Sequence, residues 1–203
     1  MLFRSRGKPS IHRAFGEPVA VLTGDALIVL AFETVARACV ADAHLAPPLL
    51  ATLARASGSP RGLAAGQAWE SESNPVLEDY HRAKTGALFV AATVCGATAA
   101  GADPAPWRPL GERLGEAYQV ADDLRDVASD PEELGKPTLR DAVLLRPNAV
   151  TELGLDGALA RLKGLLEDAA DAVPECAGAT SLRELVVTQA KRLIPKSLAQ
   201  TAA

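Results

Sequence analysis

The segment GEAYQVADDLRD, residues 115–126, carries the strongest pattern in this sequence. In an α-helix with 100° per residue, Gln119, Asp122, Asp123 and Asp126 fall within an arc of about 100°. The opposite side has the apolar spacing of a packed helix, formed by Leu114, Ala117, Tyr118, Ala121, Leu124 and Ala128. The segment therefore predicts a helix that packs on one face and presents three carboxylates and an amide on the other.

The acidic face has two interpretations. Three carboxylates on one stripe repel each other by a few tenths of a kcal/mol per pair, and a cation would remove that cost. Mg²⁺ prefers hard oxygen ligands and is usually bound by one or two carboxylates together with substrate phosphates. The alternative is a solvated acidic face, since a DDxxD pattern arises by chance in about 5% of chains of this length at ordinary Asp frequencies. The motif alone gives the two interpretations similar weight.

Length and composition favour one all-α domain. A chain of 203 residues fits a single domain over residues 1–203. Hydrophobic residues make up 48% and aromatic residues only 4%, which favours packed helices over a sheet. Strand-like alternation and internal repeats are absent, so the sequence predicts a helical bundle.

Charge and cysteine content exclude several classes. The net charge of −4, without a basic stripe, argues against nucleic-acid binding. Cys39, Cys95 and Cys176 are far apart and form no CxxC motif, which argues against structural zinc and fits a reducing cytoplasm. The longest uncharged run, residues 85–102, is only marginally long, so we expect a buried helix and no membrane-embedded segment there.

Periodicity and helix breakers define the expected elements. Residues 1–16 are polar and basic and are expected to form a loop. Asp25 lies in an apolar helix, where a hydrogen-bonded structural role is expected. Small residues after Lys84 should make its helix central. The expected helices cover residues 19–40, 49–56, 63–71, 77–100, 110–128, 139–145, 156–172 and 181–194, with a further helix start at 147–152.

Two lysine sites complement the acidic face. Lys84 and Thr85 offer an ammonium and a hydroxyl to phosphate oxygens, and Lys136 follows the acidic helix. Each lysine taken singly fits an ordinary surface role. Together with metal-bound acids, they could hold a diphosphate while a C–O bond breaks.

In this combination the chain resembles the trans-isoprenyl diphosphate synthases, most closely the geranylgeranyl diphosphate synthases of bacterial carotenoid pathways. The resemblance runs from Arg6 nearly to the C-terminus. The matching segments are RGKPSIHRAFGEPVAVLTGDALIVLAFE (6–33), GQAWESES (66–73), YHRAKTGALFVAAT (80–93), GEAYQVADDLRD (115–126), GKP (135–137) and RPNAV (146–150).

The resemblance implies an isoprenoid synthase fold with a deep cavity between helices. It implies Mg²⁺ ligands at Asp122 and Asp126, with Asp123 in support, and Gln119 beside them. Lys84, Thr85 and Lys136 would hold the allylic diphosphate, while Arg6 would bind a substrate diphosphate. Asp122, Lys84 and Thr85 would thus be the catalytic group.

The implied reaction joins an allylic diphosphate, expected to be farnesyl diphosphate, to isopentenyl diphosphate. The allylic diphosphate ionises, the double bond of isopentenyl diphosphate attacks the carbocation, and a proton is lost. The apolar lumen would protect the cation from water. A cytoplasmic homodimer acting on small-molecule diphosphates is expected.

The sequence departs from the family in three respects. The 203 residues contain no first aspartate-rich motif and lack the family's N-terminal helices, and Ser5-Arg6-Gly7 stands where the family has Arg-Arg-Gly. We therefore expect negligible synthase activity from this chain alone, whether it is a fragment, a mis-started gene product or a short homologue. A non-catalytic partner subunit of a complete synthase remains the alternative. A terpene cyclase is less favoured, because cyclases typically lack GxxxQxxDDxxD and the Lys-Thr pair.

Overall fold

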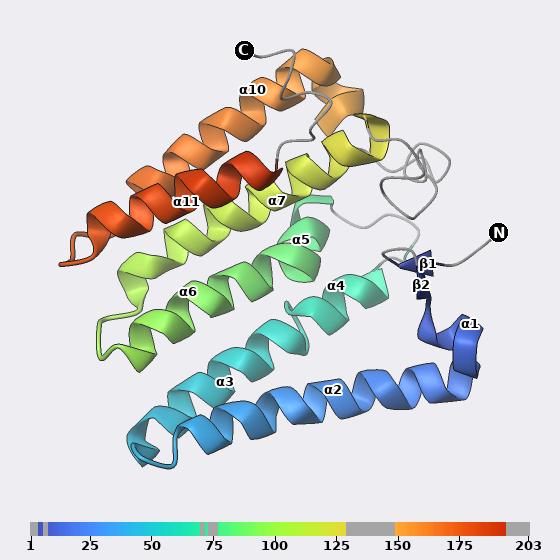
Figure 1. Ribbon diagram of the computed structural model, residues 1–203, viewed down its shortest axis with the longest axis vertical. Helices are drawn as coiled ribbons and strands as arrows, with labels where there is room; N and C mark the ends of the chain where they lie inside the picture. The colour runs from blue at the N-terminus through green and yellow to red at the C-terminus, as the bar shows by residue number, and fades with distance from the viewer. Residues whose placement is uncertain (1–3, 6–7, 70–71, 73–76, 129–148, 194–203) are drawn as a thin grey trace.

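The structure is a computed structural model that describes residues 4–5, 8–69, 72, 77–128 and 149–193. The all-α fold is confirmed (Figure 1). Its helices are α1 (Ile11–Phe15), α2 (Glu17–Ala38), α3 (Ala46–Ser57), α4 (Leu63–Trp69), α5 (Leu77–His81), α6 (Ala87–Ala99), α7 (Arg108–Ala128), α10 (Ala149–Asp171) and α11 (Ala179–Leu193). Short 3₁₀ turns cover Ala43–Leu45 and Ala105–Trp107.

Three expected boundaries are corrected. The first 16 residues are not simply a loop, because β1 (Arg4–Ser5) pairs antiparallel with β2 (Lys8–Pro9) before α1. Helix α3 includes Pro47 and Pro48, since proline in a first turn forfeits no intrahelical hydrogen bond. A π-helical turn, Arg82–Gly86, joins α5 to α6 within the expected helix 77–100. The helix expected at 139–145 lies outside the described residues.

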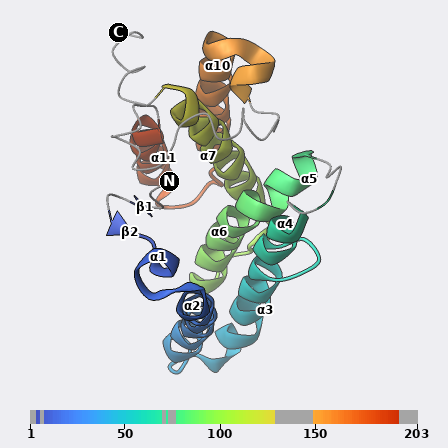
Figure 2. The ribbon, with the colours of Figure 1, turned by 90° about the vertical axis from the view of Figure 1, so that its right-hand side faces the viewer.

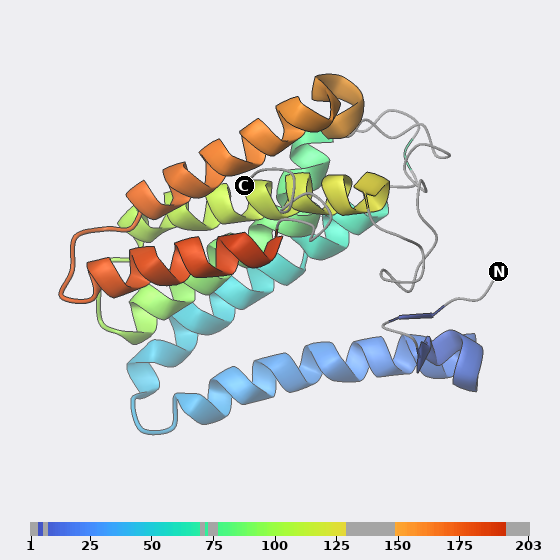
Figure 3. The same cartoon turned by 45° about the horizontal axis from the view of Figure 1, so that its top comes forward.

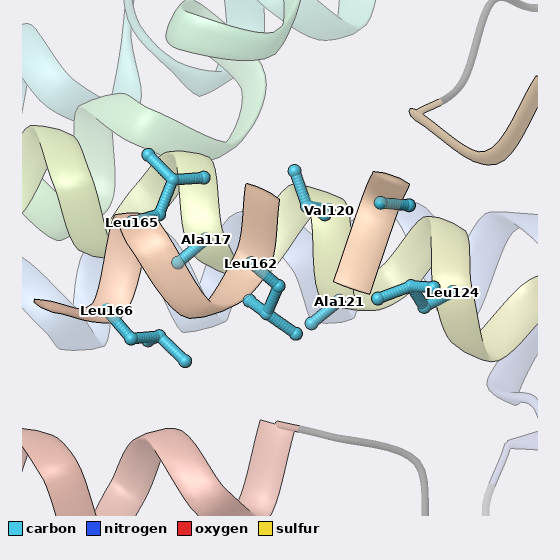
Figure 4. Close-up of a cluster of buried hydrophobic side chains, with 8 residues drawn as sticks. Ala117, Val120, Ala121, Leu124, Leu162, Leu165 and Leu166 are labelled. Carbon is cyan, nitrogen blue, oxygen red and sulfur yellow. The ribbon is translucent and has the colours of Figure 1, made fainter. Parts of the chain in front are cut away.

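Helix α7 packs between α10 and α6. Its expected apolar face is buried at Ala117, Ala121 and Leu124, whereas Tyr118, also expected there, is 39% exposed. Leu124 of α7 and Leu162 and Leu165 of α10 are the largest fully buried side chains in the described residues (Figure 4). Each such leucine contributes about 1.5–3 kcal/mol through burial. A second cluster, which includes Leu110, Val173 and Val186, attaches α11 to the same core. The helix expected to be central, now α6 with its preceding π turn, packs beside α7.

The opposite face of α7 is not a solvated acidic stripe. Asp123 and Asp126 are only 4% and 5% exposed. Their burial follows from the position of α7 inside the bundle, which periodicity within a single helix does not reveal.

Helix α2 is apolar and almost unpacked. It contacts α1 and α3 and lies apart from α7, α10 and α11 (Figures 1, 2 and 3). None of its residues is buried, and Leu22 and Val29 are 67% and 66% exposed. By length and composition it is the one helix of the described residues that could cross a membrane. Asp25 is exposed and has no hydrogen-bond partner among the described residues, so the expected structural role is wrong.

Candidate functional site

The Lys84-Thr85 pair lies in the π turn, between two helices that approach it closely. A Cβ atom on Gly66 of α4 would lie 2.5 Å from the backbone nitrogen of Lys84. A Cβ atom on Gly115 of α7 would lie 2.8 Å from Cα of Gly86. Neither position therefore tolerates a side chain without movement of the backbone. The π turn, a form enriched at functional sites, is thus held between α4 and α7.

Gln119 meets Thr85 one helical turn beyond this close approach. The Thr85 hydroxyl donates to Oε1 of Gln119 at 3.4 Å. This contact explains the G-x-x-x-Q spacing, because Gly115 brings α7 to the π turn and Gln119 then reaches Thr85. Two of the expected site residues, Thr85 and Gln119, are thus in contact.

Lys84 is placed beside an aromatic hydroxyl. Its Nζ donates to the Tyr80 hydroxyl at 2.8 Å and lies 5.2 Å from the centroid of the Tyr80 ring. The Tyr80 phenol and ring face are both neutral contacts that help to orient the ammonium.

Asp123 makes two contacts to N–H groups. The Gln119 side-chain amide donates to Oδ1 at 3.1 Å, and the Ala149 backbone N–H donates to Oδ2 at 2.8 Å. Asp123, the acid that was expected to support the metal, therefore contacts Gln119 of its own helix and the start of α10.

Asp122 and Asp126 lie one turn apart, the first half-buried and the second buried. The described residues contain no group of three or more His, Cys, Asp or Glu side chains placed to hold a metal ion. Two carboxylates one turn apart still fit Mg²⁺ when substrate phosphates complete its coordination. The donor set thus suits a metal that arrives with a diphosphate.

The structure also has a groove of about 950 Å³ between α3, α6, α7 and α10. Of the expected site residues, Gln119 and Asp123 line it, whereas Lys84, Thr85, Asp122 and Asp126 do not. The deep cavity expected between the acids and the lysines is therefore not this groove. Arg6 and Lys136 lie outside the described residues.

Sequence reasoning did not assign roles to Gly66, Tyr80 or Gly115. The pattern Tyr80-x-x-x-Lys84 places the phenol one turn before the lysine, and this spacing could have indicated the contact. The tight packing at Gly66 and Gly115 needs the tertiary structure, because a glycine in a helix looks only like a weak helix former.

The three cysteines are free thiols. Cys39 is buried and Cys176 is exposed, while burial raises the pKa of the Cys95 thiol. None of them contributes to the site described above.

The fold and this site define a class of protein. The polyprenyl synthetase family matches residues 4–179, and the chain belongs to that family. It is 53% identical over 194 residues to a geranylgeranyl diphosphate synthase of Cereibacter sphaeroides, covering 96% of this chain and 67% of the relative. The corresponding values for a geranylgeranyl diphosphate synthase of Rhodobacter capsulatus are 46% over 189 residues, with 93% and 65% covered.

Solved structures agree with the family. A geranyltransferase from Helicobacter pylori, complexed with magnesium and isoprenyl diphosphate, has a TM-score of 0.75 at 28% identity, covering 93% of this chain and 64% of that chain. A geranylgeranyl pyrophosphate synthetase from Pyrococcus horikoshii has a TM-score of 0.74 at 26% identity, with 95% and 72% covered. The chain spans about two thirds of the length of these two curated relatives.

Proposed function

We propose that this chain provides the allylic-diphosphate site of a prenyltransferase that makes geranylgeranyl diphosphate from farnesyl and isopentenyl diphosphates. The observation that carries the proposal is the contact between the π turn and α7. The π turn carries Lys84 and Thr85, and Thr85 contacts Gln119 of α7, the helix that also carries Asp122 and Asp126. The names of the two geranylgeranyl diphosphate synthases reported above support the choice of product.

Some of these residues would supply charge or hydrogen bonds to the diphosphate, and others would orient them. Lys84 offers an ammonium and Thr85 a hydroxyl to the diphosphate oxygens, and Gln119 fixes the position of Thr85. Asp122 and Asp126 would hold Mg²⁺, whose charge stabilises a leaving diphosphate. As the allylic C–O bond breaks, negative charge accumulates on the diphosphate, and oriented cationic groups favour that change. The double bond of isopentenyl diphosphate then attacks the carbocation, and a proton is lost.

The proposal includes a homodimer in the cytoplasm. The apolar surface of α2 supports it, because contiguous exposed apolar patches mark interfaces. A second copy would cover the same surface on each protomer, as a two-fold interface requires. Three free thiols suit a reducing compartment.

A binding experiment tests the site. Isothermal titration calorimetry with an unreactive thio analogue of farnesyl diphosphate should show binding that depends on Mg²⁺. Asp122→Asn combined with Asp126→Asn should weaken that binding tenfold or more, while Asp25→Asn, an exposed change on α2, should not alter it. Equal affinity with and without Mg²⁺, or in the double variant, would overturn the proposal.

The second candidate is a non-catalytic subunit that pairs with a complete synthase. The exposed face of α2 also favours this function, because it could dock on a related chain. Stable co-purification with a complete geranylgeranyl diphosphate synthase, together with a change in that enzyme's product length, would support it. Failure of both would exclude it.

A further inference from the structure

We propose that the groove between α3, α6, α7 and α10 binds an anionic amphiphile, a molecule with a phosphate or diphosphate head and a long apolar chain. The volume of the groove, about 950 Å³, lies within the range of small-molecule sites, roughly 300–1,000 Å³. Lys84, Thr85, Asp122 and Asp126 do not line it. The groove is therefore a second site, and it does not depend on the proposed function.

The floor of the groove is apolar. Helix α6 packs against both α3 and α7, and it contributes most of the floor (Figure 2). The apolar lining residues are Ala56 of α3, Ala87, Val90, Ala91 and Val94 of α6, and Val120 of α7. An apolar chain that lies along this floor is removed from water, which favours binding in proportion to the area buried.

The groove is positively charged, although the whole chain is negatively charged. The chain has a net charge of −4, whereas six arginines and four acidic residues line the groove. All four acidic residues belong to α7 and α10. Residues 52–61 contribute Arg55 and Arg61 to the lining and no acid. The excess positive charge therefore lies on the α3 side.

The two sides of the groove also differ in how their charges are paired. On the α7 side, Glu116 pairs with Arg161 and, at 3.6 Å, with Arg113. Arg55 and Arg61 form no ion pair in the part of the chain that the structure describes. A single exposed arginine is an ordinary surface residue. Two such arginines beside an apolar floor suit a phosphate head, because guanidinium groups bind phosphate oxygens through paired hydrogen bonds.

The backbone brings these two arginines to the same end of α3. The chain after Arg61 returns against the last turn of that helix, because a Cβ atom on Gly62 would lie 2.4 Å from the carbonyl oxygen of Arg55. Both arginine side chains are exposed. The charged head of a ligand can therefore contact them and remain hydrated, while its chain lies along α6.

Two sources share this chemistry, an isoprenoid diphosphate and a phospholipid. The probes are geranylgeranyl diphosphate and vesicles of phosphatidylcholine with phosphatidic acid, with vesicles of phosphatidylcholine alone as the control. All are measured in EDTA, so that a metal-dependent site contributes nothing. Binding of either anionic probe supports the groove and identifies the source. Binding of neither would overturn the proposal.

A double charge reversal tests the arginines. Arg55→Glu combined with Arg61→Glu should weaken binding of the anionic probe by about tenfold or more, because charged hydrogen bonds to the head are lost. Arg37→Glu combined with Lys163→Glu is the matched control. It makes the same change in net charge at exposed positions outside the groove, and its Kd should stay within about twofold. Equal losses in the two double variants would overturn the proposal.

Hydrogen exchange in the unmodified chain tests the location. Bound probe should slow exchange at residues 52–61 and 86–94. Protection confined to residues 19–30 would place the probe on the apolar surface of α2 and overturn the proposal. Inorganic diphosphate, which has no chain, should bind about tenfold or more weakly than geranylgeranyl diphosphate. Equal affinity for these two diphosphates would make the groove a plain anion site and would contradict the amphiphile.

The same arginine variant separates this site from the proposed function. Mg²⁺-dependent binding of the farnesyl thio analogue should persist in it, because neither arginine belongs to the proposed allylic-diphosphate site. Loss of that binding would merge the two sites and overturn the inference. Absence of Mg²⁺-dependent binding in the unmodified chain would instead count against the proposed function alone.

Discussion

At the scale of the residue, the contact between Lys84 and Tyr80 orients the lysine side chain. Its ammonium donates to Tyr80 and lies over the ring of that residue. Because hydrogen bonds to charged groups contribute about 1.5–3 kcal/mol, a residue placed in this way can account for a large share of the affinity for an anion.

We predict that Lys84→Ala weakens binding of the farnesyl diphosphate analogue by about 10–100-fold, the equivalent of one charged hydrogen bond. Calorimetric titration in Mg²⁺ measures the change. Lys163→Ala, an exposed change on α10, is the control and should leave the Kd unaltered. Similar affinities for the Lys84 and Lys163 variants would remove Lys84 from the site.

The cysteines provide a second prediction at this scale. Burial raises the pKa of the Cys95 thiol from 9.0, so less of it is thiolate at pH 8, and thiolate is the reactive form. Maleimide should modify the exposed Cys176 first and Cys95 much later, as followed by peptide mass spectrometry. Stability should fall as the pH rises above 9, because the unfolded chain loses that proton more readily. Equal labelling rates for the two thiols would contradict this prediction.

At the scale of the element, the π turn depends on close contact with its neighbours. Gly66 and Gly115 let α4 and α7 approach the backbone at Lys84 and Gly86. Thr85 and Gln119 can meet only if these helices remain that close.

We predict that Gly115→Ala destabilises the chain by about 1–3 kcal/mol, a typical cost of inserting a methyl group into a packed contact. The expected clash is with Gly86, and analogue binding should weaken as Thr85 moves from Gln119. Gly164→Ala on α10 is the matched control. Its new Cβ atom has open space, and it should raise stability by up to about 1 kcal/mol through helix propensity. Urea unfolding measures both, and equal effects of the two changes would contradict the close contact.

Part of this element-scale picture could be predicted from the sequence. Apolar spacing correctly identified the packed face of α7, where Leu124 is fully buried. The π turn could not be predicted, because a five-residue turn inside a helix keeps the same residue types and nearly the same periodicity. Helix α3 began earlier than expected because Pro47 and Pro48 were taken as breakers although they fit a first turn.

At the scale of the whole molecule, α2 leaves a long apolar surface uncovered. Leu22 and Val29 lie seven residues apart, and so on nearly the same side of the helix. Such a surface favours association, since its burial removes apolar area from water.

We predict that the purified chain is a dimer of about twice its 21.1 kDa mass in light scattering. Leu22→Asp combined with Val29→Asp should yield a monomer, because two desolvated charges would oppose the interface. Leu185→Asp, an exposed change on α11, should leave the dimer intact. A monomeric unmodified chain would reject the homodimer.

We also predict negligible turnover when these 203 residues are assayed alone with farnesyl diphosphate, isopentenyl diphosphate and Mg²⁺. The reason is that they contain one aspartate-rich motif, which supplies ligands on only one side of a diphosphate. Product analysis by chromatography decides the point. Turnover at a rate typical of an enzyme, on the order of 1 s⁻¹ or more, would contradict it.

The sequence by itself determined the helical fold and the family, because residue type and spacing record which side of a helix is apolar and which motifs the chain carries. Only the tertiary structure showed that Asp123 and Asp126 are buried and that the Ala149 N–H donates to Asp123 from 26 residues away, because both depend on how α7 packs against other helices. The exposure of α2 also depends on the tertiary structure. Hydrophobic spacing predicts an apolar helix but does not show which other helices will cover it.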